Sequence, residues 1–211
     1  MPVQVVLADD HQVVRQGIKA LLERGEAHRV IGEASNGWEA VRLTQELKPD
    51  VVVIDIGMPI LNGLEAAREI HTGSPRTPVI VFSRHSEDSY VLAALKAGVR
   101  GYVVKTQDSW DLVLAIREVM QGHFYVSPST SRAVVDAYFS KSSISGEVLT
   151  AREREVLQLT AQGKTSSRIA RILGISARTA ESHRARIRTK LGISDTPGLV
   201  RYAVRHGLIE P

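Results

Sequence analysis

Short apolar runs alternate with amphipathic stretches along the first 122 residues of the chain. The apolar runs are rich in valine and isoleucine, which is typical of strands buried in a parallel sheet. The stretches between them repeat apolar residues three or four positions apart, which is typical of helices that cover such a sheet. The pattern predicts strands at 3–8, 29–34, 50–55, 79–83 and 101–105, followed in turn by helices at 11–24, 37–47, 62–71, 88–97 and 108–121.

This alternation predicts a doubly wound α/β fold, because two parallel strands need a crossover that is usually helical. Right-handed crossovers give five parallel strands in the flavodoxin-like order 2-1-3-4-5. The first and third strands then meet where the winding reverses, which is where such sheets bind their ligands. The third strand holds four consecutive apolar residues and delivers Asp55 to that edge. Asp55 is therefore the centre of the predicted site.

The alternation stops after residue 122. A stretch from Ser127 to Phe139 favours a short helix, and small polar residues follow it, which is typical of a linker. The predicted organisation is a first domain at 1–122, a linker at 123–147 and a second domain at 148–211.

Four helices are predicted in the second domain. Thr150 and Glu153 have the spacing of a capping box, and Gly163 ends the helix that they begin. Ser176 is expected to cap a longer helix, and Pro197 stands in the first turn of the last one. Two short helices joined through a glycine, the second rich in arginine, predict a small all-α helix-turn-helix domain.

Charge divides the chain in the same place. Residues 1–147 carry 15 basic and 18 acidic residues, a net charge of −3, whereas residues 148–211 carry 12 and 5, a net charge of +7. A small basic domain is typical of a nucleic-acid binder, although a solvated basic surface is the alternative. The sequence has no cysteine, no signal-peptide pattern at its start and no apolar run near the roughly 18 residues of a membrane span. We therefore expect a cytoplasmic protein without a membrane partner.

Acidic residues end the first and third predicted strands at Asp9, Asp10 and Asp55. Carboxylates this close repel one another unless a cation lies between them, and oxygen ligands suit Mg²⁺ or Mn²⁺ better than zinc. A divalent ion beside a carboxylate also suits phosphoryl transfer. Ser83 and Lys105 end the fourth and fifth strands, where they would offer a hydroxyl and a positive charge to phosphoryl oxygens. Each residue alone has an ordinary alternative, such as helix capping or solvation, but their common position at strand ends favours one site.

Residues 1–122 resemble a response-regulator receiver domain. The resemblance rests on an acidic pair, an acid followed by a Gly-x-Pro turn, a later glycine, a serine and a lysine: Asp9, Asp10, Asp55, Gly57, Pro59, Gly63, Ser83 and Lys105. It implies that Asp55 receives a phosphoryl group from the phosphohistidine of a sensor histidine kinase. Thr106 stands where many receivers have a proline, which leaves the peptide geometry of that loop open.

The same resemblance implies roles for the neighbours of Asp55. Ser83 and Tyr102 are expected to change position when the phosphoryl group arrives, and Lys105 is expected to bind it. The implied ligands of Mg²⁺ are Asp9 (through water), Asp10, Asp55 and the backbone carbonyl of Gly57.

Residues 149–209 resemble the four-helix DNA-binding domain of the LuxR/NarL/FixJ type. The matching positions are Leu149, Thr150, Arg152, Glu153, Glu155, Val156, Leu157, Gly163, Lys164, Ile169, Ala170, Leu173–Ser176, Thr179, His183, Lys190, Leu191 and His206–Ile209. The two resemblances cover nearly all of the chain, which as a whole resembles a NarL/FixJ-type transcriptional regulator.

The helix predicted to begin after Ser176 is expected to meet DNA, with one face kept for the core by Ala180, His183, Ile187 and Leu191. His183 is interpreted as a packing and phosphate-facing residue rather than a metal ligand, because no partner ligand lies near it in the sequence. The residues expected to contact bases or phosphates are Lys164, Thr165, Ser166, Arg178, Glu181, Ser182, Arg184, Ala185, Arg186, Arg188 and Lys190.

Two features of the second domain leave alternatives open. Ala180 and Glu181 replace the Val-Lys usual in relatives, so the operator sequence does not transfer from them. The last helix, 199–206, is apolar enough either for core packing or for pairing of two copies on DNA.

The leading hypothesis is a two-component response regulator whose phosphorylation controls homodimerisation and sequence-specific binding to double-stranded DNA, with RNA polymerase as a further candidate partner. The alternative is an orphan regulator that binds DNA without phosphorylation. An aspartyl-phosphate phosphatase would need a second acid two residues after Asp55, and Gly57 stands there. We therefore expect no enzymatic activity beyond self-phosphorylation and self-dephosphorylation.

Overall fold

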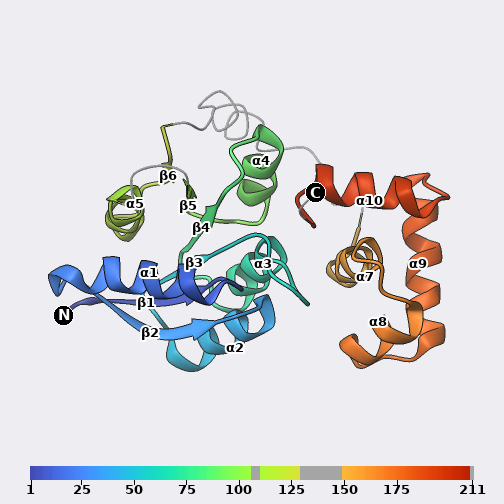
Figure 1. Ribbon diagram of the computed structural model, residues 1–211, viewed down its shortest axis with the longest axis horizontal. Coiled ribbons are helices and arrows are strands. Elements are labelled where there is room, and N and C mark those ends of the chain that lie inside the picture. Colours follow the sequence, from blue (N-terminus) through green and yellow to red (C-terminus); the bar gives the residue numbers. More distant parts are fainter. Residues whose placement is uncertain (106–109, 129–148, 210–211) are drawn as a thin grey trace. The chain divides into compact units, whose positions relative to one another are not determined.

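The computed structural model describes residues 1–105, 110–128 and 149–209. The chain divides into two compact units, residues 1–141 and residues 142–211. The first is an α/β unit and the second is a helical unit (Figure 1). No helix in the described ranges is both long enough and apolar enough for a membrane span.

The α/β unit is built on a parallel sheet in the order β2-β1-β3-β4-β5-β6. The first five strands confirm the predicted order 2-1-3-4-5. The sixth joins the edge of the sheet at Tyr125 and Val126, in the segment that the sequence assigned to a linker, and pairs Tyr102 with Val126. The strands are β1 (Val3–Ala8), β2 (His28–Ala34), β3 (Val51–Ile54), β4 (Val79–Ser83), β5 (Gly101–Val104) and β6 (Tyr125–Val126).

Helices cover both faces of this sheet, α1 and α5 on one and α2, α3 and α4 on the other (Figure 1). Successive residues of β3 therefore enter different cores. Val51 and Val53 pack with α1 and α5, whereas Val52 and Ile54 pack with α2, α3 and α4. Because both faces are buried, the strand is apolar throughout rather than at every second position. The helices are α1 (Gln12–Leu22), the 3-10 turn η1 (Glu23–Gly25), α2 (Gly37–Leu47), α3 (Gly63–Gly73), α4 (Asp88–Lys96) and α5 (Trp110–Met120).

The helical unit confirms the four predicted helices. Thr150 and Glu153 form the predicted capping box, in which each side chain accepts a hydrogen bond from the other's backbone N–H. Gly174 ends a helix at a φ of 64°, in the left-handed region that favours glycine. Ser176 caps the next helix by accepting from Thr179 N. The helices are α7 (Ala151–Ala161), α8 (Ser166–Leu173), α9 (Ala177–Leu191) and α10 (Thr196–Arg205).

Three expectations lie wholly or partly outside the described residues. They are the loop geometry at Thr106, the N-cap of α5 at residue 108 or 109, and the short helix predicted from Ser127 to Phe139, of which only residues 127 and 128 are described.

Candidate functional site

The carboxyl ends of the central strands bring together three of the predicted site residues. Asp9 follows β1, Asp55 follows β3, and Lys105 follows β5. The ammonium Nζ of Lys105 lies 2.7 Å from Asp9 Oδ2 and 2.7 Å from Asp55 Oδ1. The side chains of both acids are nearly buried, at 2% and 6% exposed. Two buried carboxylates that contact the same ammonium group are close enough to repel each other, and the positive charge of Lys105 offsets this repulsion.

A glycine lets the chain pass close behind Asp55. A Cβ atom on Gly63 would lie 1.9 Å from the carbonyl oxygen of Asp55, far inside a van der Waals contact. Gly63 N donates to the carbonyl oxygen of Ile56 at 3.0 Å, and Gly57 N donates to Asp55 Oδ2 at 3.2 Å. The loop after β3 is therefore folded tightly around the predicted phosphoacceptor.

A histidine that was not predicted as a site residue, His11, contacts both acids of the pair Asp9 and Asp10. His11 Nδ1 lies 2.7 Å from Asp10 Oδ1 and 3.3 Å from Asp9 Oδ1. One possible metal-ligating atom from each of Asp9, Asp10 and His11 lies within 4.8 Å of the other two. The only sequence signal for His11 was its position next to the pair.

The donor set suits a hard divalent cation. Asp9 is engaged by Lys105 and by His11 N, whereas the Asp10 side chain contacts the exposed His11 ring and is itself 30% exposed. Carboxylate and carbonyl oxygens from Asp10, Asp55 and Gly57 are the chemistry that Mg²⁺ or Mn²⁺ prefers. The residues therefore fit such an ion.

Ser83 and Tyr102 both form hydrogen bonds with the backbone of His85. Ser83 is fully buried, and its Oγ accepts from His85 N at 3.3 Å. The Tyr102 hydroxyl donates to the carbonyl oxygen of His85 at 2.7 Å. Burial raises the pKa of Tyr102, so its hydroxyl stays protonated as a donor. The His85 ring stacks on Tyr90 with centroids 4.0 Å apart, which connects the end of β4 to α4.

A buried acid, Asp111, holds β6 and the residue after it beside β5 at the lateral edge of the sheet. Asp111, near the start of α5, accepts hydrogen bonds from the hydroxyls of Tyr125 and Ser127. Ser127 also donates from its backbone N to the carbonyl oxygen of Tyr102 at 2.9 Å, and its Oγ accepts from Val104 N at 3.1 Å. Asp111 had no predicted role, because an acid in the first turn of a helix is ordinary.

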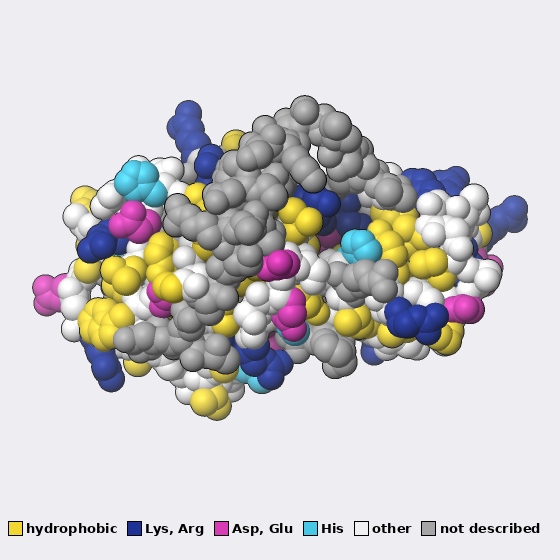
Figure 2. Space-filling view, turned by 90° about the horizontal axis from the view of Figure 1, so that it is seen from above, with side chains coloured by type: hydrophobic (Ala, Val, Ile, Leu, Met, Phe, Trp, Pro, Cys, Tyr) yellow, Lys and Arg dark blue, Asp and Glu magenta, His cyan; other side chains and the backbone are white. Residues whose placement is uncertain are grey.

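The predicted DNA-contacting residues lie on α8, α9 and the turn before α8. Ala180 and Ile187 are buried and His183 and Leu191 are part-buried, which confirms the predicted core face. Lys and Arg side chains stand out on the visible face of the helical unit (Figure 2). The exposed members of the set are Lys164, Thr165, Arg178, Glu181, Ser182, Ala185, Arg186 and Lys190, and the part-buried members are Ser166, Arg184 and Arg188.

Four members of that set also have contacts within the unit. Thr165 caps α8 by accepting from Arg168 N, and Arg184 Nη1 donates to Ser166 Oγ at 3.1 Å. Lys190 Nζ lies 2.6 Å from Glu153 Oε2, which ties the end of α9 to the start of α7. The ammonium of Lys190 is thus already paired.

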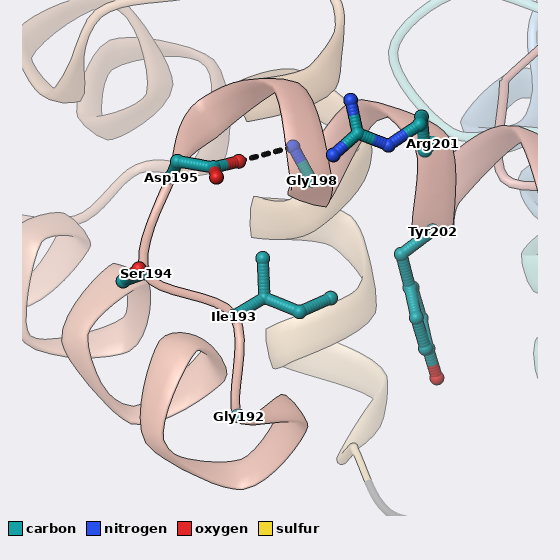
Figure 3. Close-up of a pocket in the computed structure, with 7 residues that line it drawn as sticks. All are labelled: Gly192, Ile193, Ser194, Asp195, Gly198, Arg201 and Tyr202. Carbon is teal, nitrogen blue, oxygen red and sulfur yellow. Dashed lines mark hydrogen bonds between the residues drawn. The ribbon is translucent and has the colours of Figure 1, made fainter.

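Figure 3 shows the corner between α9 and α10, where Asp195 caps α10 by accepting from Gly198 N. Beside this cap lies a shallow depression of about 350 Å³, with Arg201 and Tyr202 at its rim. Leu199 and Ala203 are buried in the core of the unit, so core packing accounts for those two apolar positions of α10.

Two protein families match the chain. Response regulator receiver domain matches residues 5–117, and bacterial regulatory proteins, luxR family, matches residues 147–203. The chain belongs to the LuxR-type response regulators. Its relatives include the oxygen regulatory protein NreC of Staphylococcus epidermidis, 35% identical over 98% of this chain and 99% of NreC, and the transcriptional regulatory protein MctR of Rhizobium johnstonii, 34% identical over 98% and 95%.

Solved structures agree with this family. A LuxR-family response regulator from Aurantimonas is similar with a TM-score of 0.62 and 34% identity, over 66% of this response regulator and 99% of that chain. RcsB from Salmonella enterica serovar Typhimurium, bound to promoter DNA with the phosphomimetic BeF₃⁻, is similar with a TM-score of 0.63 and 26% identity, over 96% and 98%. The resemblance stated from the sequence is confirmed.

Proposed function

We propose that this response regulator accepts a phosphoryl group on Asp55 from a sensor histidine kinase, and that phosphorylation controls homodimerisation and sequence-specific binding to double-stranded DNA. The observation that carries the proposal is the joint contact of Lys105 with Asp9 and Asp55 at one sheet edge. In this proposal the Asp55 carboxylate is the nucleophile, and the contact supports it because a positive charge lies one hydrogen bond away.

In the transfer, a carboxylate oxygen of Asp55 attacks phosphorus while the P–N bond to the kinase histidine breaks. The electron pair of that bond stays on the ring nitrogen of the histidine. Lys105 remains beside the new acyl phosphate and offsets the charge of its oxygens. Bound Mg²⁺ would further neutralise these oxygens, held by Asp10, Asp55 and the Gly57 carbonyl, with Asp9 helping through water.

Readout of the phosphoryl group is proposed to pass through Ser83 and Tyr102. The Ser83 hydroxyl would turn from His85 N to a phosphoryl oxygen, and Tyr102 would change the hydrogen bond that it now makes to His85. Both residues start from defined, buried contacts, so the switch exchanges one packed arrangement for another.

The phosphoacceptor is tested by incubating the purified chain with acetyl phosphate and Mg²⁺ and separating the phosphorylated form on a phosphate-affinity gel. Asp55→Asn should abolish labelling. Asp88→Asn, which changes an exposed acid in α4, should leave it intact. Labelling of Asp55→Asn at the wild-type level would refute the assignment.

The DNA proposal is tested by mass and duplex affinity with and without beryllofluoride and Mg²⁺. We expect a dimer and tighter DNA binding with the phosphomimetic, and affinity that falls steeply with salt. Equal affinity in both states would favour the phosphorylation-independent alternative. A cytoplasmic location, a contact with RNA polymerase and the absence of enzymatic turnover are further parts of this proposal.

A further inference from the structure

The N-terminal half of α9 carries an exposed acid on a basic helix. α9 holds five basic residues and one acid, Glu181. Arg178, Glu181, Ser182 and Ala185 are all exposed and recur three or four positions apart, so they form one stripe along two turns. In a helix-turn-helix, residues near the start of the second helix contact base edges. The acid therefore lies among the positions that would read DNA sequence.

Among the described residues of the helical unit, Glu181 makes no polar contact that would give its carboxylate a structural role. Arg178 and Arg184 stand three positions before and after it, at the spacing of helical ion pairs. Nevertheless, Glu181 forms no ion pair or hydrogen bond with any residue in the described part of the chain. The cap of α9 is supplied by Ser176, and Glu181 is the fifth helical residue, beyond the first turn in which the helix dipole favours an acid. Its carboxylate is available to an outside partner.

A free carboxylate on this stripe repels DNA phosphates and so lowers affinity for every sequence. A base that donates a hydrogen bond in the major groove can offset that repulsion. Cytosine donates from its N4 amino group, and glutamate is a suitable acceptor. Adenine presents its N6 donor beside the N7 acceptor, a pair that suits an amide better than a carboxylate. The chemistry of Glu181 therefore favours cytosine.

We propose that Glu181 selects a cytosine in the operator by accepting a hydrogen bond from the N4 amino group of the base. The inference rests on the proposed function, in which α9 enters the major groove. Arg178 lies three residues earlier on the same face, roughly 4.5 Å along the helix axis, which is between one and two base-pair steps of roughly 3.4 Å. Since arginine pairs best with guanine, the selected sequence should hold this cytosine within one or two base pairs of a contacted guanine.

The test selects binding sites from a random duplex library with the full-length wild-type chain, Glu181→Ala and Glu181→Gln. Wild type should prefer one cytosine over the other bases by about five- to thirtyfold. Glu181→Ala should lose that preference to within twofold, while its affinity for unrelated duplexes stays equal or rises. Glu181→Gln should move the preference at the same position toward adenine, which a purely structural residue would not do.

Glu26→Gln is the matched control, because it removes the same charge from an exposed position in the α/β unit. It should keep the wild-type sequence preference. If both Glu181 variants keep the cytosine and only bind all duplexes more tightly, Glu181 is a repulsive surface charge and the inference is wrong. A wild-type chain that selects no sequence overturns the proposed function as well, so the two failures are distinguishable.

Discussion

Replacing Asp111 with alanine should destabilise the α/β unit by about 3 kcal/mol. The change removes the acceptor of two hydrogen bonds, from Tyr125 and from Ser127. A hydrogen bond to a charged group contributes about 1.5–3 kcal/mol, and a buried donor left without a partner loses a comparable amount. Ser127 is 1% exposed and cannot turn to water, whereas the part-buried Tyr125 can. One bond is therefore lost in full and the other only in part.

Urea unfolding followed by tryptophan fluorescence measures this loss. Both tryptophans, Trp38 and Trp110, lie in the α/β unit, so the signal reports that unit. Asp88→Ala is the control, because it removes an exposed acid from the first turn of α4 as Asp111→Ala does from α5. Loss of a favourable helix-dipole contact alone amounts to about 0.3–1 kcal/mol. If Asp111→Ala lowers the free energy of unfolding no more than Asp88→Ala, the fastening of β6 by this acid contributes nothing.

Three further predictions follow from local contacts. Gly63→Ala should misplace Asp55, because the new Cβ meets backbone, and acetyl-phosphate labelling should fall at least tenfold; wild-type labelling would show that the loop can shift. Burial raises the pKa of Glu153, but hydrogen bonds from Lys190 and Thr150 outweigh it and leave the pKa below its ordinary value of 4.5. The helical unit should therefore lose stability as the pH falls below 4.5 and Glu153 is protonated. Glu153→Gln should remove this pH dependence in circular-dichroism melts. Burial and the hydrogen bond to the Asp111 carboxylate raise the pKa of Tyr125 above its ordinary value of 10. The contribution of this hydrogen bond to the stability of the α/β unit should therefore be complete below pH 10 and decline at higher pH. Tyr125→Phe should lack that decline in urea unfolding.

The sequence alone determined the first five strands of the sheet, the helices that cover it and the positions where those strands end. Strands covered on both faces are apolar at every position, so the run before Asp55 could be recognised without a partner. Caps are equally local, which is why Thr150, Glu153 and Ser176 were predicted correctly. Because the carboxyl ends of parallel strands share one edge, the sequence also predicted that Asp9, Asp55 and Lys105 meet.

Only the tertiary structure decided which atoms touch there. Lys105 reaches acids 96 and 50 positions earlier, and β6 reaches Asp111 only because α5 packs beside β5. Lys190 is predicted to contact DNA, and nothing in the sequence indicated that its ammonium also pairs with Glu153, 37 positions away on another helix. Periodicity and capping depend on neighbours within a few residues, whereas these contacts depend on how whole elements pack. For that reason the sequence located the site, and the fold determined the partners of each charge within it.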